Sequence, residues 1–261
     1  NARPYRVRFL DGTELRVKFG ELSVRRREVE DELRTPGEDV GKYVVYRVAV
    51  GSRAFGLATD ESDEDRRGIY LPPADWHWSL FKPPEQVESA AGGVEEVDWE
   101  IEKFIRLALQ ANPNILETLW SPVVLHADEV GRELRELRPA FLSRHLFKTY
   151  SGYVLSQFRL MQRGHDRAGA FKAKHAMHLI RLLYSGIHAL RTGDILVDVG
   201  EHRDELLSIR RGEWTFQQVR DRALALNVEF QSAAAATALP DRPDYDRVNR
   251  FLVAARKRMV R

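Results

Sequence analysis

The spacing of apolar residues changes near residue 103, and this change limits the folds open to the chain. Before it, short apolar runs at 43–50, 69–71 and 94–101 are bounded by glycine, proline or polar residues, which is typical of strands and turns. After it, apolar residues recur at three- and four-residue steps, as in amphipathic helices. The sequence therefore predicts a mixed α/β region followed by a helical region, and we expect two domains, at 1–125 and 126–261.

Local signals predict further elements. Asp11-Gly12, between alternating runs at 5–9 and 14–19, predicts a β-hairpin. Asn112-Pro113 suits the N-cap and the first position of a helix, whereas the proline-rich stretch 72–95 predicts a long loop. The remaining helices are expected at 126–137, 139–163, 168–192, as a shorter pair within 203–232, and at 244–260.

Composition excludes several kinds of protein. The 261 residues contain no cysteine, which rules out disulfides, thiolate zinc sites and cysteine nucleophiles. No run approaches the roughly 18 apolar residues of a membrane span, so we expect a cytoplasmic protein without a membrane partner. The 41 Lys and Arg nearly balance the 39 Asp and Glu, and a net charge of +2 does not by itself indicate a nucleic-acid-binding protein. Any metal must be held by carboxylate, carbonyl or imidazole groups.

The most informative segment is a glycine-serine turn followed by two acidic residues. Val50 ends an apolar run and leads into Gly51 and Ser52, whose amides and hydroxyl could hold the phosphates of a nucleotide. Asp63 and Asp65 are two residues apart, so both carboxylates face the same side of an extended strand. Two adjacent carboxylates repel each other unless a hard cation such as Mg²⁺ lies between them. The segment therefore predicts a metal-assisted phosphate site.

A third carboxylate would complete such a site. Asp98 and Glu100, also two apart, are candidates if 94–101 is a strand, and we favour Asp98. The competing interpretation treats the acidic run 60–65 as a solvated turn, which is what most charge runs are. The preceding Gly-Ser turn favours the metal site.

One helix carries a polar stripe that could meet phosphates. Within 168–192, Lys174, His178 and Arg181 follow helical spacing on one side, and Lys and Arg both suit anionic oxygens. Arg53, inside the Gly-Ser turn, could stabilise charge on a transferring phosphoryl group. The alternative for the stripe is a solvated helix face.

Several segments resemble one family of nucleotidyltransferases. The hydrophobic-Gly-Ser turn, ten residues, and Asp-x-Asp resemble the signature of the polymerase-beta nucleotidyltransferase superfamily. Four segments resemble, in order, the RNA repair pathway DNA polymerase beta family: GSRAFGLATDESDEDRRGIYLPP, KFIRLALQANPNILETLW, KHAMHLIRLLYSGIHALRTGDI and LLSIRRGEW. Glu64 and Arg66 depart from the superfamily, which commonly has hydrophobic residues there, so the strand with the carboxylates is expected to be exposed or to end early.

This resemblance implies an α+β fold, with a small mixed sheet flanked by helices before the helical region. It implies transfer of a nucleoside monophosphate from a nucleoside triphosphate such as ATP, with Mg²⁺, or Mn²⁺ in its place, as cofactor. Carried over by residue, Gly51 and Ser52 would hold the triphosphate, Asp63 and Asp65 the metals, and Asp98 the third carboxylate position.

The family description suggests an RNA end as acceptor and partner. The same carboxylates would also serve adenylylation of a small molecule or a protein. A partner-controlled module of the antitoxin kind and a non-catalytic nucleic-acid-binding module are further alternatives, although the presence of Ser52, Asp63 and Asp65 argues against an inactive enzyme. The preferred nucleotide, template use and oligomeric state have no signal in the sequence.

Overall fold

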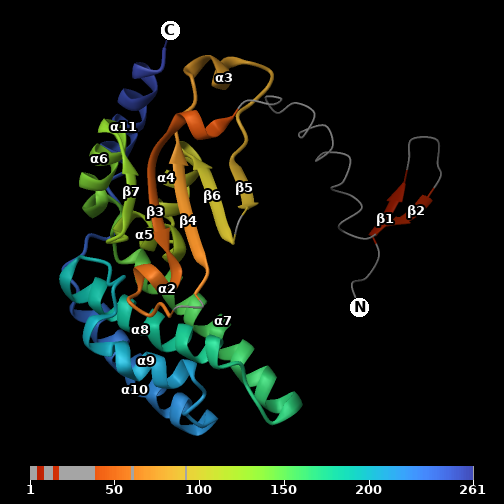
Figure 1. Cartoon of the computed structure of the whole chain (residues 1–261), viewed down its shortest axis with the longest axis vertical. Helices are drawn as coiled ribbons and strands as arrows, with labels where there is room; N and C mark the ends of the chain where they lie inside the picture. The colour runs from red at the N-terminus through yellow and green to blue at the C-terminus, as the bar shows by residue number, and fades with distance from the viewer. Residues whose placement is uncertain (1–4, 9–13, 18–38, 60–61, 92, 261) are drawn as a thin grey trace.

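The computed structural model describes the backbone of residues 5–8, 14–17, 39–59, 62–91 and 93–260 (Figure 1). Strands β1 (Tyr5–Arg8) and β2 (Glu14–Val17) pair antiparallel, which confirms the predicted pairing of these two runs. The predicted turn at Asp11-Gly12 lies outside the described residues, as do Asp60 and Glu61 of the acidic run.

The main sheet has five strands in the order β5-β6-β4-β3-β7. They are β3 (Val44–Val50), β4 (Glu64–Tyr70), β5 (Gln86–Ala91), β6 (Val94–Glu100) and β7 (Val124–Ala127). The strand β3 pairs antiparallel with β4 and β7, whereas β4 and β6 run parallel to each other. The sheet is therefore mixed, as expected, and the fold is α+β.

Helices pack against the sheet and then form a bundle below it (Figure 1). They are η1 (Val40–Tyr43), α2 (Gly51–Ala54), α3 (Ala74–Trp78), α4 (Ile101–Leu109), α5 (Pro113–Trp120), α6 (Glu129–Glu136), η2 (Arg138–Phe141), α7 (His145–Ala168), α8 (Ala173–Thr192), η3 (Gly200–His202), α9 (Arg203–Arg210), α10 (Phe216–Ala236) and α11 (Tyr245–Arg258). Asn112 caps α5 with its side chain, and Pro113 begins that helix, as predicted. No helix of the described part of the chain is long and apolar enough to cross a bilayer.

Three expectations about the elements need correction or qualification. The stretch 72–95 is not one long loop, because it contains α3 and the edge strand β5. The strand expected to hold both carboxylates does not end early, since β4 pairs along its whole length with β6, but it begins at Glu64 and so contains Asp65 and not Asp63. The expected domain boundary at 125 falls inside β7, which pairs with β3, and α11 returns to contact α4. The division into two domains stays a prediction, and one buried apolar cluster includes residues of both halves.

A glycine in the middle of β4 allows a partly buried ion pair to cross the sheet. Gly68 is the register partner of Arg47 on β3 and of Asp98 on β6. Nη2 of Arg47 donates to Oδ2 of Asp98 over 2.7 Å, directly across Gly68. A methyl group at residue 68 would overlap Oδ1 of Asp98 and lie 3.3 Å from Nε of Arg47. The lack of a side chain at this position makes room for the pair.

Replacing Gly68 by alanine should therefore destabilise the protein by about 1–3 kcal/mol, the usual cost of overfilling a packed site. The measurement is urea unfolding at neutral pH. Gly152→Ala in α7 is the matched control, because no atom lies within 4 Å of its added Cβ and helix propensity should raise stability there by about 0.5–1 kcal/mol. Equal effects of the two substitutions would contradict the steric argument.

Candidate active site

The turn after β3 lies directly against the carboxylate of Asp65. Val50 and Asp65 are register partners at the ends of β3 and β4. The next residue, Gly51, has a positive φ of 65°, and a Cβ there would come within 2.6 Å of Oδ2 of Asp65. Glycine is therefore needed both for the backbone conformation and for the close approach. The Gly51 turn and the carboxylate of Asp65 therefore form one compact unit.

A small cavity of about 210 Å³ joins this unit to helix α8. We call it the inner cavity; it is lined by Gly51, Ser52, Phe55, Leu57, Ser62, Asp63, Asp65, Lys174, Met177, His178 and Arg210. Asp63 lies just before β4, and its carboxylate shares this cavity with that of Asp65. The cations Lys174 and Arg210 thus share the cavity with two carboxylates and a serine hydroxyl. The predicted residues Gly51, Ser52, Asp63, Asp65, Lys174 and His178 are thus brought together.

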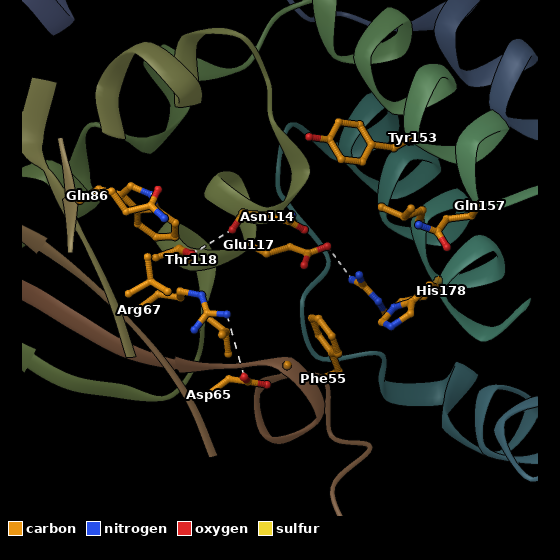
Figure 2. Close-up of a pocket in the computed structure, with 16 residues that line it drawn as sticks. Phe55, Asp65, Arg67, Gln86, Asn114, Glu117, Thr118, Tyr153, Gln157 and His178 are labelled. Carbon is orange, nitrogen blue, oxygen red and sulfur yellow. Dashed lines mark hydrogen bonds and ion pairs between the residues drawn. The ribbon is translucent and has the colours of Figure 1, made fainter. Parts of the chain in front are cut away.

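A second cavity of about 460 Å³, the outer cavity, lies on the other side of Asp65. It shares Gly51, Phe55, Asp65 and His178 with the inner cavity. Its other walls come from the sheet and from three helices: Val50, Arg67, Gln86, Val97, Trp99, Asn114, Glu117, Thr118, Tyr153, Gln157, Arg181 and Leu182. Figure 2 shows Asp65 and Arg67 on one side of this space and Asn114, Glu117, Tyr153 and Gln157 across it.

Arg181 occupies a different position from the one expected of a phosphate-binding residue. Its Nη1 donates to Oε1 of Glu117 on α5 over 2.5 Å, and both side chains are about 95% buried. The guanidinium also lies 3.8 Å from the ring centre of Phe55, a cation–π contact. Arg181 lines the outer cavity only, and its contacts join α8 to α5 and to the segment after α2.

Asp98 and Glu100 do not face the cavities. Side chains alternate between the two faces of a strand, and Asp98 lies in register with Gly68, three residues from Asp65. Its carboxylate therefore lies on the opposite face of the sheet, where it pairs with Arg47. Burial raises the pKa of Asp98, and Arg47 offsets part of that rise. Glu100 caps α4 through the amides of residues 102 and 103.

The third carboxylate is therefore not at Asp98, because the pleat turns it away from Asp65. Glu95 is the residue of β6 in register with Asp65 and lies on the same face, and it is exposed. Arg53 is also exposed and lines neither cavity, so the geometry gives it no contact with the space beside Asp65.

Two groups beside the carboxylates were not among the residues expected to bind nucleotide. Arg210 lies at the end of α9, where its Nη1 donates to the carbonyl oxygen of Leu57 over 3.1 Å while it lines the inner cavity. In the sequence, Arg210 is followed by Arg211 and Gly212, which is typical of a helix end and does not by itself place the side chain beside the carboxylates. Glu117 gave no signal, because a glutamate in an amphipathic helix usually faces solvent.

The carboxylates suit a hard divalent cation, although no preformed cluster is present. Within the described residues, no group of three His, Cys, Asp or Glu side chains is arranged to hold a metal ion. Mg²⁺ commonly takes one or two protein carboxylates and completes its shell with water and substrate phosphates. Asp63 and Asp65, beside the Gly51 turn, meet that requirement. Arg67 Nη2 lies 3.9 Å from Oδ1 of Asp65 and partly balances its charge.

His178 should remain neutral at physiological pH. Burial, together with the neighbouring cations Arg181 and Lys174, lowers its pKa to about 4. NMR titration of the ring, assigned by comparison with His178→Gln, should therefore show a midpoint near 4. The unfolded chain binds this proton near pH 6.5, so His178 should reduce stability as the pH falls from 6.5 towards 4. A midpoint near 6.5 would contradict this burial.

Removing either partner of the ion pair between Glu117 and Arg181 should lower the free energy of unfolding. Arg181→Met leaves a buried carboxylate without its cation, and Glu117→Leu leaves a buried guanidinium without its anion; each should cost about 3–5 kcal/mol. The double variant removes both charges, so its loss of unfolding free energy should be clearly smaller than the sum of the two single losses. Urea unfolding of the four proteins gives the coupling energy. Additive losses would mean that the two groups do not stabilise each other.

Comparison with known proteins identifies the family of the chain. Residues 25–254 match RlaP, the RNA repair pathway DNA polymerase beta family. YcgL of Bacillus subtilis is 34% identical over 115 residues, which are 43% of this chain and 44% of YcgL. A Methanocaldococcus jannaschii protein, MJ0002, is 23% identical over 163 residues, 61% of this chain and 65% of that protein. The matched segments thus span less than two thirds of either relative.

Among solved structures, a nucleotidyltransferase-like protein from Exiguobacterium sibiricum is 14% identical, with a TM-score of 0.34, over 82% of this chain and 75% of the other. That similarity is too distant to transfer residue positions. The family match covers most of the chain and includes the Gly51 turn, both carboxylates of the inner cavity and helix α8. The chain therefore belongs to the RNA repair pathway DNA polymerase beta family of nucleotidyltransferases.

Proposed function

We propose that the protein transfers a nucleoside monophosphate from a nucleoside triphosphate to an acceptor hydroxyl and releases pyrophosphate. The observation that carries this proposal is the contact between the Gly51 turn and Asp65, in one cavity with Asp63, Lys174 and Arg210. Few other reactions need a phosphate-binding turn, paired carboxylates and opposing cations within one small space.

The inner cavity is suited to the triphosphate. Ser52 offers its hydroxyl and lies beside the Gly51 amide, and Lys174 is an exposed cation at the start of α8. Arg210 is anchored by the carbonyl of Leu57, so its remaining guanidinium donors can bind an anionic oxygen. His178, kept neutral by burial, lines the wall between the two cavities. Its neutral ring adds no positive charge but can form a hydrogen bond to the substrate.

Asp63 and Asp65 would hold Mg²⁺, or Mn²⁺ in its place. When bound, such ions would lower the pKa of the attacking hydroxyl and stabilise the negative charge on the departing pyrophosphate. In the transfer, the acceptor oxygen forms a bond to the α-phosphorus, the bond from that phosphorus to pyrophosphate breaks, and the hydroxyl proton is released. Arg67, beside Asp65 in the outer cavity, is placed to stabilise negative charge near this phosphorus.

An RNA end is the acceptor that the family description favours. We expect the acceptor to reach Asp65 through the outer cavity. Asp65 lines both cavities, whereas Ser52 lines only the inner one, so the acceptor and the triphosphate would lie in different cavities. Adenylylation of a small molecule or of a protein uses the same bond changes, so the acceptor must be found by experiment.

The first test is a transfer assay with each labelled nucleoside triphosphate, Mg²⁺ or Mn²⁺, and RNA, DNA and protein acceptors. Asp63→Asn and Asp65→Asn should each lower transfer by at least about 100-fold, because an amide replaces the anionic oxygen in the site. Asp98→Asn is the matched control: the same change on the opposite face of the sheet should leave transfer largely intact.

Circular dichroism at the assay temperature must show that all three variants are folded. Transfer that persists in Asp63→Asn and Asp65→Asn would contradict the proposed site. A loss in Asp98→Asn equal to that in Asp65→Asn would restore the third carboxylate to Asp98. Label on a protein, and on no nucleic acid, would keep the chemistry and change the acceptor.

A further inference from the structure

The outer cavity continues along the surface of α7. A groove of about 440 Å³ shares Tyr153 with the outer cavity and is lined by His145, Lys148, Thr149, Gly152, Tyr153 and Ser156. A second groove of about 450 Å³ shares Gly152 and Ser156 with the first and ends at Arg159, Gln162 and Arg163. Neighbouring hollows therefore follow one another from the outer cavity along α7, which extends from below the sheet to the edge of the bundle (Figure 1).

The outward face of α7 is positively charged, and the single acidic residue of the helix, Asp166, lies in its last turn, three residues after Arg163. Lys148, Arg159 and Arg163 are exposed and lie on one side of the helix at steps of eleven and four. No Asp or Glu occurs between His145 and His165. None of the three cations forms an ion pair with any residue that the structure describes; Arg163 Nε donates to the carbonyl oxygen of Arg159. Their charges are available to a partner.

A glycine interrupts this face at a position where no contact within the described residues requires one. Gly152 lies in the interior of a 24-residue helix, where glycine lowers helix stability relative to alanine. No atom lies within 4 Å of a Cβ added there, and the residue borders both grooves. The packing of this chain therefore does not explain the glycine, whereas the close approach of a ligand backbone would.

Tyr153 lies where the groove opens into the outer cavity. Its side chain lines both spaces, and Figure 2 shows the ring projecting from α7 towards the cavity. A partly exposed tyrosine ring offers a flat surface on which a nucleic-acid base can stack. Asn114 and Gln157, also on the cavity wall, supply hydrogen-bonding groups.

We propose that this α7 track, made of Lys148, Gly152, Tyr153, Ser156, Arg159 and Arg163, binds a single-stranded nucleic acid whose end enters the outer cavity. The cations would contact phosphates, Gly152 would admit the sugar-phosphate backbone, and Tyr153 would stack on a base near the end. The proposal rests on the proposed function, because the track leads to Asp65. The substrate is then a nucleic-acid strand and not a free small molecule.

The dimensions of the track predict a minimum length of strand. From Lys148 to Arg163, α7 rises about 22 Å at 1.5 Å per residue. At about 3.4 Å per phosphate along a stacked strand, this distance corresponds to about six nucleotides. Affinity should therefore rise with oligonucleotide length up to about six or seven nucleotides and then level off.

The test is fluorescence anisotropy with labelled single-stranded RNA and DNA of two to ten nucleotides, without nucleoside triphosphate. The double variant Arg159→Gln and Arg163→Gln should lower affinity by about tenfold or more at low salt. It should also reduce the slope of log affinity against log salt by about 1.4, or about 0.7 for each phosphate that is no longer neutralised. Arg247→Gln and Arg250→Gln on α11 is the matched control, since both arginines are exposed and that helix lies at the other end of the molecule (Figure 1).

A second variant tests the path of the strand separately from its charge. Gly152→Gln adds a helix-compatible side chain into open space, so it should leave the melting temperature unchanged or higher. It should nevertheless weaken binding of oligonucleotides that reach beyond Tyr153 and leave dinucleotide binding unchanged. Equal affinity of wild type and Gly152→Gln for the longer strands would overturn the path along α7.

The outcomes separate this inference from the proposed function. Asp65→Asn should still bind strands while losing transfer, and the α7 variants should still bind labelled nucleoside triphosphate. Strand affinity that is the same in wild type and in the Arg159/Arg163 variant would overturn the track, even if transfer to some acceptor is retained. Equally tight binding of polyglutamate would also overturn it, because the face would then select only for negative charge.

Discussion

Glu117 and Arg181 form a buried ion pair that joins the sheet half of the molecule to the helical half. Arg181 also covers Phe55, which follows the Gly51 turn. Because a buried charge without its partner is costly, α8 has one favourable position against α5 and the turn. That position brings Lys174 and His178, on the same helix, to the cavity that contains Asp63 and Asp65. The position of α8 relative to Asp63 and Asp65 thus depends on the ion pair between Glu117 and Arg181, which includes neither carboxylate.

The two faces of the sheet have different roles. Asp65, Arg67 and Val97 face the cavities, whereas Arg47 and Asp98 pair across Gly68 on the other face. Both faces contain acidic and basic side chains, so charge alone does not distinguish them. What differs is accessibility: the carboxylate of Asp98 is nearly fully buried and paired, while those of Asp63 and Asp65 border open space. A carboxylate that must bind a cation together with a substrate needs to border open space.

The overall charge of +2 conceals an uneven distribution. Many arginines are paired with acids, such as Arg47 with Asp98, Arg222 with Glu205 and Arg256 with Glu102. Among the described cations without such partners, Lys148, Arg159 and Arg163 lie on the outward face of α7, which borders the outer cavity. A strand bound there would bring its end to the side of Asp65 opposite the inner cavity. The acceptor and the triphosphate would then approach the carboxylates from different directions.

The sequence alone determined what depends on local chemistry: the change from strands to helices near residue 103, the helix start at Pro113, and the Gly51-Ser52 turn with Asp63 and Asp65. These follow from periodicity, capping and backbone conformation within a few residues. Tertiary structure decided which carboxylate of β6 faces Asp65, because the register between strands, and not the spacing along one strand, sets that face. It also assigned Arg181 to Glu117 and anchored Arg210 on Leu57, beside the carboxylates. These contacts join residues 64 and 153 positions apart, and pairing at such distances depends on packing energies that no local pattern records.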